Sequence, residues 1–397
     1  MFTNRIHRIT PSATLEMTQK AAELKRAGKP VYNLSVGEPD FDTPKHIQNA
    51  GIYAIKNGIT KYTPESGTLE LKEAICKKLK RDNNLKFNLE EIVVSCGGKH
   101  SLYNACQVLF EKEDEVIIFS PYWVSFPDFV LVTGATPVFV KTVATKQYEP
   151  DFDDLKRKIS KKTKGIIINS PSNPTGGVWS DEAIKELLKI LQPFQNIWIL
   201  SDECYEQLTY GQRFKSIATF DLSNNKIITF QSCSKTYAMT GWRIGYIAGN
   251  KKLVKSVSKL QGQSTSCPNS IAQHAATEAL AGDQQCVQMM KNIFKKRRDL
   301  ILSELKKIEG ITCNTPNGAF YVFPNISHYL NTMDEKRKKI KTSSDLCMYI
   351  LNKTGVVTVS GDSFGAPEYI RLSYATSNDT IIKAVDLINR AVKKLNF

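Results

Sequence analysis

The segment 231–246 contains the side chains whose chemistry stands out most in this sequence, with Lys235 at its centre. Two hydroxyl residues, Ser232 and Ser234, precede the lysine, and Arg243 follows it. Hydroxyls and a bidentate guanidinium hold a phosphate dianion well. A lysine that is shielded from water can lose its proton and attack an aldehyde. The segment therefore combines a candidate phosphate site with a candidate nucleophile.

A ligand that suits both parts of this segment carries a phosphate and an aldehyde, as pyridoxal phosphate does. The alternative is that Lys235 is one of the 54 basic residues of the chain and lies on a solvated loop. A lone Ser-x-Ser-Lys pattern is too short to decide between these interpretations. The decision depends on what the rest of the sequence places around Lys235.

Other candidate residues follow the ends of predicted strands. Strands are expected at about 91–95, 115–119, 137–141, 165–169, 196–200, 226–230 and 244–248. Helical or loop segments separate most of them, which is typical of a largely parallel sheet with helices on both faces. Ligands on such sheets bind beyond the carboxyl ends of the strands. The residues at five of these ends are Gly98, Tyr122 with Trp123, Asn173, Asp202 and Lys235.

Two glycine turns could present backbone N–H groups to a ligand. Gly98 lies between a strand and a helix, a position that attracts anions. A nucleotide-binding P-loop would need a glycine in place of Val93 and a serine or threonine in place of His100, which excludes that motif. The segment 37–44 begins with an exposed glycine, although Gly and Pro there also suit a simple turn.

The remaining pattern predicts two structural units. Helices are expected at 13–27, at 45–57, after Pro64 to about 81, at 99–110 and across 269–307, with a break near 281–283. Shorter strands are expected at 31–36, 319–323, 356–359 and 369–373. We predict a large domain at 45–285 and a smaller α+β domain at 286–397, with the N-terminal segment 1–44 packed on the small domain. Residues 335–341 are expected to form a surface loop.

The composition is that of an ordinary soluble globular protein, with 41% hydrophobic and 23% charged residues. No apolar run reaches the roughly 18 residues that cross a bilayer, and no apolar signal region follows the N-terminus, so we expect a cytoplasmic protein. The nine cysteines form no CxxC pair, which favours reduced thiols and no metal site. Cys76, Cys106 and Cys204 lie in apolar-patterned segments and are expected to be buried.

The net charge of +15 is the unusual feature of the composition. The excess is spread over helical segments, such as 77–81 and 295–298, that we expect to be solvated surfaces. No helix-turn-helix, zinc finger or RNP-like pattern accompanies it, so we expect no specific nucleic-acid binding. Attraction of anionic substrates is a second consequence of such a charge.

Several motifs in order give the sequence a family resemblance. They are Pro11–Thr14, Gly37–Pro44, Gly97–Lys99, Ser120–Ser125, Asn169–Gly176, Ser201–Tyr205, Ser232–Arg243 and Arg371–Ala375. The chain resembles, from end to end, the class I pyridoxal-phosphate aminotransferases of fold type I, and among them the bacterial aspartate aminotransferases of subgroup Ib, some of which also use prephenate. The resemblance implies a mostly parallel seven-stranded sheet in the large domain.

The resemblance also implies roles around the cofactor ring. Lys235 would carry pyridoxal phosphate covalently and then act as the base and acid of catalysis. Asp202 would pair with the ring nitrogen and keep it protonated. Asn173 and Tyr205 would bond to the phenolate oxygen, and Trp123 would stack on the ring. Without the resemblance, these residues could equally be a turn asparagine, a capping aspartate and core aromatics.

For the phosphate, the family pattern implies Ser232, Arg243 and the backbone at Gly98 and Lys99. A tyrosine equivalent to Tyr62 reaches the phosphate from the neighbouring subunit in this family. The resemblance therefore implies a homodimer with shared active sites.

The substrate site follows from the same resemblance. Arg371 would bind the α-carboxylate in bidentate fashion, with help from the Gly37 backbone and Asn173. Lys99 would bind the distal carboxylate, although it could also simply begin a solvated helix. We therefore expect a ping-pong aminotransferase that moves the amino group of L-aspartate to 2-oxoglutarate.

Two departures from the family pattern qualify this expectation. Prephenate-active members have a lysine where this chain has Thr10, so we expect prephenate not to be used. Cys204 replaces a more usual aliphatic residue and is expected only to pack. The alternatives are an aromatic or broad-specificity aminotransferase, a pyridoxal-phosphate C–S lyase, and a basic nucleic-acid-binding or regulatory protein that keeps the fold without turnover.

Overall fold

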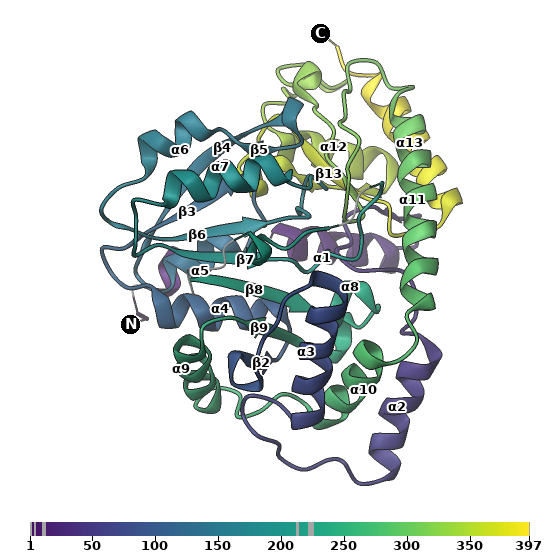
Figure 1. Ribbon diagram of the computed structural model, residues 1–397. Helices are drawn as coiled ribbons and strands as arrows, with labels where there is room; N and C mark the ends of the chain where they lie inside the picture. Colours follow the sequence, from purple (N-terminus) through teal and green to yellow (C-terminus); the bar gives the residue numbers. More distant parts are fainter. Residues whose placement is uncertain (1, 4, 10–12, 212–213, 221–225, 397) are drawn as a thin grey trace.

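The largest layer of the molecule is an eight-stranded sheet (Figure 1). Its apolar strands alternate along the chain with amphipathic helices. The computed structural model describes every residue except 1, 4, 10–12, 212–213, 221–225 and 397. The strands are β2 (Ile92–Ser95), β3 (Glu115–Ser120), β4 (Thr136–Val143), β5 (Glu149–Pro150), β6 (Thr163–Asn169), β7 (Trp198–Asp202), β8 (Ile227–Ser232) and β9 (Gly245–Ala248), in the order β2-β9-β8-β7-β6-β3-β4-β5. All seven expected strands are present, and the two-residue β5 adds an edge beside β4.

The five strands β3, β4, β6, β7 and β8 are parallel to their mutual neighbours, whereas β9 runs antiparallel to both β2 and β8. The carboxyl ends of β6, β7 and β8 consequently meet at one edge of the sheet. Their registers pair Asn169 with Asp202, and Asp202 with Phe230. This alignment places the residues that follow the three strands side by side.

Helices cover both faces of this sheet, as its nearly uninterrupted apolar strands require. On one face, α4 (Gly98–Leu109), α5 (Phe126–Leu131) and α9 (Lys251–Gly262) pack through residues such as Leu102 and Val254. The other face is covered by α2 (Lys45–Lys56), α3 (Leu69–Asn83), α6 (Phe152–Lys158), α7 (Asp181–Leu191) and α10 (Ser270–Ala281). Helix α7 shows the local cause, because Ser180 caps its first turn and Ile184, Leu187 and Leu191 form its buried face.

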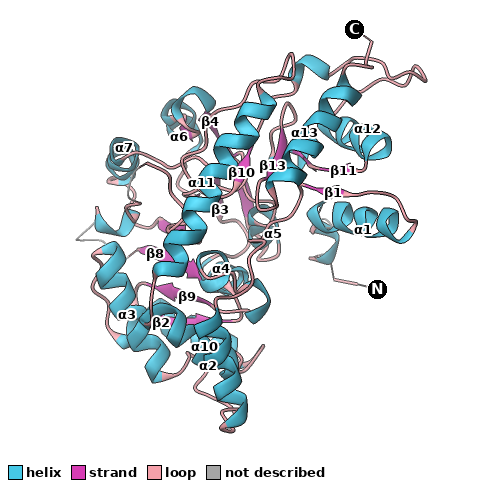
Figure 2. Cartoon of the chain, turned by 90° about the vertical axis from the view of Figure 1, so that its right-hand side faces the viewer, coloured by secondary structure: helices cyan, strands magenta, loops and turns pink. Residues whose placement is uncertain are grey.

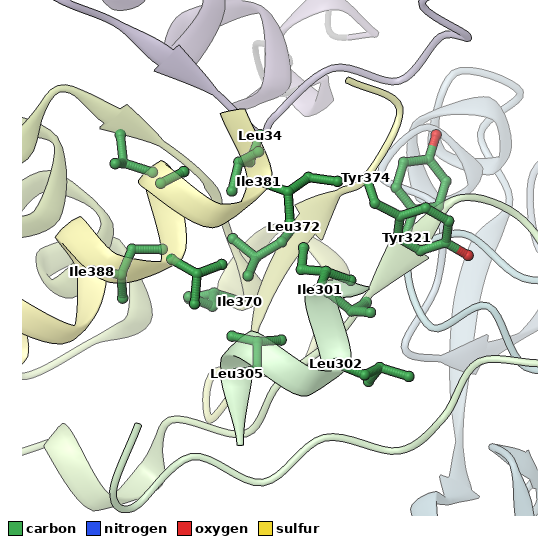
Figure 3. Close-up of a cluster of buried hydrophobic side chains, with 14 of the residues drawn as sticks. Leu34, Ile301, Leu302, Leu305, Tyr321, Ile370, Leu372, Tyr374, Ile381 and Ile388 are labelled. Carbon is green, nitrogen blue, oxygen red and sulfur yellow. The ribbon is translucent and has the colours of Figure 1, made fainter. Parts of the chain in front are cut away.

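A second region contains α11 (Gln285–Leu305), α12 (Ser343–Thr354), α13 (Asn378–Val392) and a three-stranded antiparallel sheet of β10 (Tyr321–Val322), β13 (Ile370–Ser373) and β12 (Val359–Ser360). Its apolar core joins α11 and α13 through Ile301, Leu372 and Ile388 (Figure 3). The N-terminal segment joins this region, since β1 (Tyr32–Asn33) pairs with β11 (Val356–Val357) and α1 (Ala13–Arg26) lies beside it (Figure 2). The domain limits 1–44, 45–285 and 286–397 remain our prediction.

The expected helices are present within a few residues, including the break between α10 and α11. The segment 335–341 contains no helix or strand, as predicted for a surface loop. Among the described residues, no helix is long and apolar enough to span a membrane, and no group of His, Cys, Asp and Glu side chains is arranged to hold a metal ion.

Two expectations about burial were wrong in part. All nine cysteines are described and free, but only Cys106 of the three expected to be buried is so; Cys76 and Cys204 are half-buried. The basic segments 77–81 and 295–298 are not wholly solvated, because Lys78 and Arg298 lie on the inner faces of α3 and α11 and are buried.

Candidate active site

A cavity of about 320 Å³ at the carboxyl ends of β6, β7 and β8 gathers the predicted site residues. Its lining contains Gly37, Gly98, Lys99, Trp123, Asn173, Asp202, Tyr205, Ser232, Lys235, Arg243 and Arg371, and also Leu102, Val124, Asn169, Cys204, Ser234 and Tyr321. Two candidates do not line it: Tyr62, and the strand-end residue Tyr122, whose ring stacks on Phe139. The Tyr62 side chain is 90% exposed, on the loop between α2 and α3.

Lys235 enters the cavity from α8 (Cys233–Thr236), the short helix that begins directly after β8. Its Nζ donates a hydrogen bond to the Gly37 carbonyl oxygen at 2.5 Å, so the loop between β1 and α2 meets the end of β8 here. Burial lowers the pKa of the Lys235 ammonium from its usual value, and the nearby cations Arg243 and Arg371 act in the same direction. This environment favours the neutral amine, which is the nucleophilic form.

Asp202 is the last residue of β7, and its side chain is buried. Its Oδ1 accepts a hydrogen bond from the backbone N–H of Cys204 at 3.2 Å, and among the described residues no lysine or arginine forms an ion pair with it. Burial raises the pKa of Asp202 to about 6. A carboxylate that is buried without an ion-pair partner would be stabilised by a cationic N–H group supplied by a ligand.

Arg371 reaches the cavity from β13, in the second region, and its side chain is only 2% exposed. Its Nη1 donates to Asn173 Oδ1 at 2.9 Å, and its Nη2 donates to the Ser35 carbonyl at 2.7 Å. The guanidinium lies 4.4 Å from the ring centre of Tyr321 and 5.2 Å from that of Phe364.

None of these contacts neutralises the guanidinium. No described carboxylate pairs with Arg371, and its buried Nε lacks a hydrogen-bond partner in the described structure. A buried cation with only neutral partners is a strong candidate to bind an anion.

A second group of anion-binding elements lies where α4 begins. Ser232 caps α8, and its Oγ is 2.8 Å from Ser234 Oγ. Arg243 lies so close to Gly97 that a Cβ at Gly97 would stand 2.3 Å from the guanidinium. A side chain at position 97 would displace the end of Arg243, and the positive φ of Gly97, 91°, favours glycine there. The free N–H groups of α4, two hydroxyls and a guanidinium thus line the cavity together, as a phosphate requires.

Lys99 and Trp123 form one wall of the cavity. Lys99 Nζ lies 5.0 Å from the centre of the Trp123 ring, a cation–π contact. Burial lowers the pKa of Lys99, and Arg243 adds to this effect. Lys99 therefore lines the cavity and contacts Trp123, although the residue also remains exposed to solvent at the start of α4.

Some residues of the site escaped prediction. Tyr321 lines the cavity, and its Oη is 2.9 Å from Tyr205 Oη, yet no motif or spacing singled it out. Cys204 packs on the apolar core as expected, but it also lines the cavity. Its position directly after the Asp202-Glu203 pair was the available signal. Thr10, on which the expectation about prephenate depends, lies outside the described residues.

Comparison with known proteins gives one consistent result. The family model of class I and II aminotransferases matches residues 29–388. A probable aspartate/prephenate aminotransferase of Rhizobium leguminosarum bv. phaseoli and an aspartate aminotransferase of Geobacillus stearothermophilus are each 43% identical to this chain, over 97% of both chains. The crystal structure of the aspartate aminotransferase from Rhizobium meliloti superimposes with a TM-score of 0.96 at 40% identity, covering 100% of each chain. The Thermus thermophilus aspartate aminotransferase with maleate has a TM-score of 0.92 at 36% identity, over 98% of this chain and 99% of that one.

Proposed function

Because this chain belongs to the class I and II aminotransferases, we propose that it is an aspartate aminotransferase that uses pyridoxal phosphate to transfer the amino group of L-aspartate to 2-oxoglutarate. The observation that carries the substrate assignment is a pair of cations in one cavity, Arg371 and Lys99, neither of which forms an ion pair with a carboxylate of the described residues. Two such cations suit a dicarboxylate, whose charges must both be compensated once water is removed.

The residues of the cavity fit the cofactor. Asp202 offers a buried carboxylate for the ring nitrogen, and Ser232, Arg243 and the N-terminus of α4 offer donors for the phosphate. Tyr205, Asn173 and Trp123 line the same cavity, where the first two would bond to the phenolate oxygen and Trp123 would stack on the ring. When bound, pyridoxal phosphate supplies an aldehyde for an amine and an electron-withdrawing ring that stabilises negative charge at the substrate Cα.

The chain's own contribution to the reaction is positioning and proton transfer. Lys235 Nζ, whose pKa burial lowers, can take the proton from the substrate Cα in its neutral form and later return it. Arg371 holds the α-carboxylate in a plane set by Asn173 and the Ser35 carbonyl, so the Cα–H bond keeps a defined direction. Lys99 then binds the distal carboxylate from the Trp123 wall.

The experiment that tests this function follows the absorbance of the yellow enzyme during a half-reaction without acceptor. Aspartate, glutamate, phenylalanine, alanine and cystathionine are titrated separately. We expect aspartate and glutamate to bleach the enzyme stoichiometrically. In Lys99→Ala, kcat/KM for the two acidic substrates should fall by about 100-fold while alanine and phenylalanine change little, because an apolar side chain leaves a desolvated carboxylate unpaired.

The exposed lysine Lys162 provides the matched control, since Lys162→Ala removes the same charge from the surface and should leave all five titrations unchanged. Conversion by phenylalanine but not by aspartate would replace the substrate assignment with an aromatic aminotransferase. Release of ammonia from cystathionine would identify a C–S lyase.

We further infer that the enzyme is a homodimer in which Tyr62 of one subunit reaches the phosphate site of the other. Support comes from the 90% exposed Tyr62 side chain and from the neighbouring face of α2, where Ile52, Tyr53 and Ile55 are exposed. Such an apolar patch is expected to be covered in an oligomer. Ile55→Lys should shift the sedimentation of the protein toward the monomer and weaken cofactor binding with it. The nine free thiols suit a reducing compartment, which supports a cytoplasmic location.

A further inference from the structure

We propose that Tyr321 is a positioning residue that links the carboxylate-binding guanidinium of Arg371 to the hydroxyl of Tyr205. Its ring would hold the guanidinium in place, and its hydroxyl would strengthen Tyr205 as a hydrogen-bond donor to the bound cofactor. The inference rests on the proposed function, because Tyr205 is assigned to the cofactor there.

Tyr321 belongs to β10, which reaches the cavity from the second region of the molecule. The side chain is fully buried, and its ring centre lies 4.4 Å from the guanidinium carbon of Arg371. The guanidinium also contacts a second aromatic ring, because the ring centre of Phe364 lies 5.2 Å from the same carbon. Stacking of this kind restrains the plane of the guanidinium before any carboxylate binds.

The hydroxyl of Tyr321 has one described partner, the hydroxyl of Tyr205 at 2.9 Å. Two phenols that share one hydrogen bond retain one further O–H proton between them. If Tyr321 donates to Tyr205, the proton of Tyr205 is available to an acceptor in the cavity. Burial raises the pKa of both phenols, and the charge of Arg371, whose guanidinium lies against the Tyr321 ring, opposes this rise at Tyr321. The Tyr321 hydroxyl is therefore the better donor of the two.

A hydroxyl that accepts a hydrogen bond becomes a stronger donor itself, so the two tyrosines would act in series on the cofactor oxygen. Removing the Tyr321 hydroxyl should weaken the stabilisation of negative charge on that oxygen. The bound pyridoxal phosphate would then hold its proton more firmly. The pKa read from the pH dependence of its absorbance, which we call the spectral pKa, would rise. Removing the whole ring should in addition loosen Arg371 and weaken substrate binding.

The test uses Tyr321→Phe, Tyr321→Leu and the matched control Tyr374→Phe. Tyr374 is also fully buried and donates one hydrogen bond, to the Ala319 carbonyl at 3.1 Å, but it does not line the cavity. For each loaded enzyme, the spectral pKa, the KM for aspartate, kcat and the melting temperature are measured.

We expect Tyr321→Phe to raise the spectral pKa by roughly 0.5–1 unit with little change in KM, in keeping with the loss of one hydrogen bond. Tyr321→Leu should show the same pKa rise and a KM for aspartate about 10-fold higher. Tyr374→Phe should lower the melting temperature as much as Tyr321→Phe and leave the spectral pKa unmoved.

Equal spectral pKa values in Tyr321→Phe and Tyr374→Phe would overturn the proposed effect of the Tyr321 hydroxyl on Tyr205. An unchanged KM for aspartate in Tyr321→Leu would overturn the proposed role of the ring in holding Arg371. Both outcomes differ from failure of the proposed function, in which the wild-type protein itself would take up no pyridoxal phosphate.

Discussion

Two neighbouring polar clusters lie at the ends of β7 and β8, and each contains a buried lysine. The lysine of one cluster forms no ion pair among the described residues, whereas the lysine of the other is paired with a glutamate. One is the cavity that contains Lys235, Asp202, Tyr205 and Ser232. The other, which we call the Lys78 cluster, consists of Lys78, Asn83, Glu203, Glu206, Gln231 and Tyr246. The clusters are neighbours in sequence, because Glu203, Glu206 and Gln231 are each adjacent to a cavity residue, and side chains alternate in direction along a strand.

In the Lys78 cluster, the lysine is paired with a carboxylate, and the remaining polar side chains are hydrogen-bonded to one another. The side chain of Lys78 is 2% exposed, and its Nζ donates to Asn83 Oδ1 at 2.9 Å and to Gln231 Oε1 at 2.7 Å while forming an ion pair with Glu206. Gln231 Nε2 bridges Glu203 and Glu206 at 3.2 Å each. The cluster thereby ties α3 to the ends of β7 and β8.

Lys235 has only the Gly37 carbonyl as a described hydrogen-bond partner, and its pKa is lowered by burial. The comparison separates two uses of buried charge. Paired charges hold strands in place, whereas charges left without a partner are available to a ligand and tend to mark functional sites.

The largest effect that would test this contrast is expected from Lys235→Ala. Because Lys235 supplies both the amine and the proton transfer, kcat should fall by at least ~10⁴-fold. Stability of the cofactor-free protein should change little, since no buried carboxylate loses an ion-pair partner and Asp202 loses only the attraction of a charge that is not paired with it. Single-turnover kinetics and thermal unfolding measure the two quantities. Substantial residual turnover would contradict the role of Lys235, and a large loss of stability would contradict the contrast with Lys78.

A smaller effect of opposite kind is expected from Lys78→Met. The change leaves Glu206 buried without its cation, which should cost about 3–5 kcal/mol of unfolding free energy. Adding Glu206→Gln removes the unpaired charge and should restore most of the loss, while Asn83 keeps a hydrogen-bond partner. Urea denaturation of the wild type and both variants gives the comparison. If Lys78→Met were as stable as the wild type, the cluster would not be what fixes the strand ends.

The smallest effect concerns pH. Burial, together with the neighbouring Glu206, raises the pKa of Glu203 to about 8. The native state therefore holds a proton that the unfolded chain has released above its own, lower pKa, so stability falls as pH rises through 8. Asp202, whose pKa burial raises to about 6, acts in the same sense at lower pH.

Between pH 6 and 8, Glu203 should accordingly account for a decline of at most about 1.4 kcal/mol per pH unit in the cofactor-free protein. Glu203→Gln cannot release this proton and should flatten the curve in that window. The pH dependence of urea unfolding provides the measurement, with Asp153→Asn, at an exposed carboxylate, as the control. A curve of unchanged slope in Glu203→Gln would show that Glu203 is already ionised in the native protein.

Local patterns in the sequence were sufficient for most of the fold. The seven long strands and the main helices follow from apolar runs, glycine turns and helical periodicity, which act within a few residues. Strand β5 was missed because it is two residues long and contains Pro150, so it carries no strand pattern. The strand-end residues Asn173, Asp202 and Lys235 converge because parallel strands end at one edge, and this too could be predicted from the order of elements.

Contacts between distant segments could not be predicted in this way. Arg371 meets Asn173 from a strand 198 residues further along the chain, and its role was expected only from the family resemblance. Tyr321 reaches Tyr205 across 116 residues, and no local pattern in a short strand of the second region indicates that contact.

The basic segment 77–81 shows most clearly which features follow from local sequence and which depend on tertiary contacts. The sequence by itself determined that these residues lie on one helix, because their neighbours have helical periodicity and Thr68 caps its first turn. Only the tertiary structure decided that Lys78 is buried and paired while Lys77 remains at the surface. The physical reason is that burial of a charge depends on its partner, and Glu206 lies 128 residues away on a segment that folding alone brings beside α3.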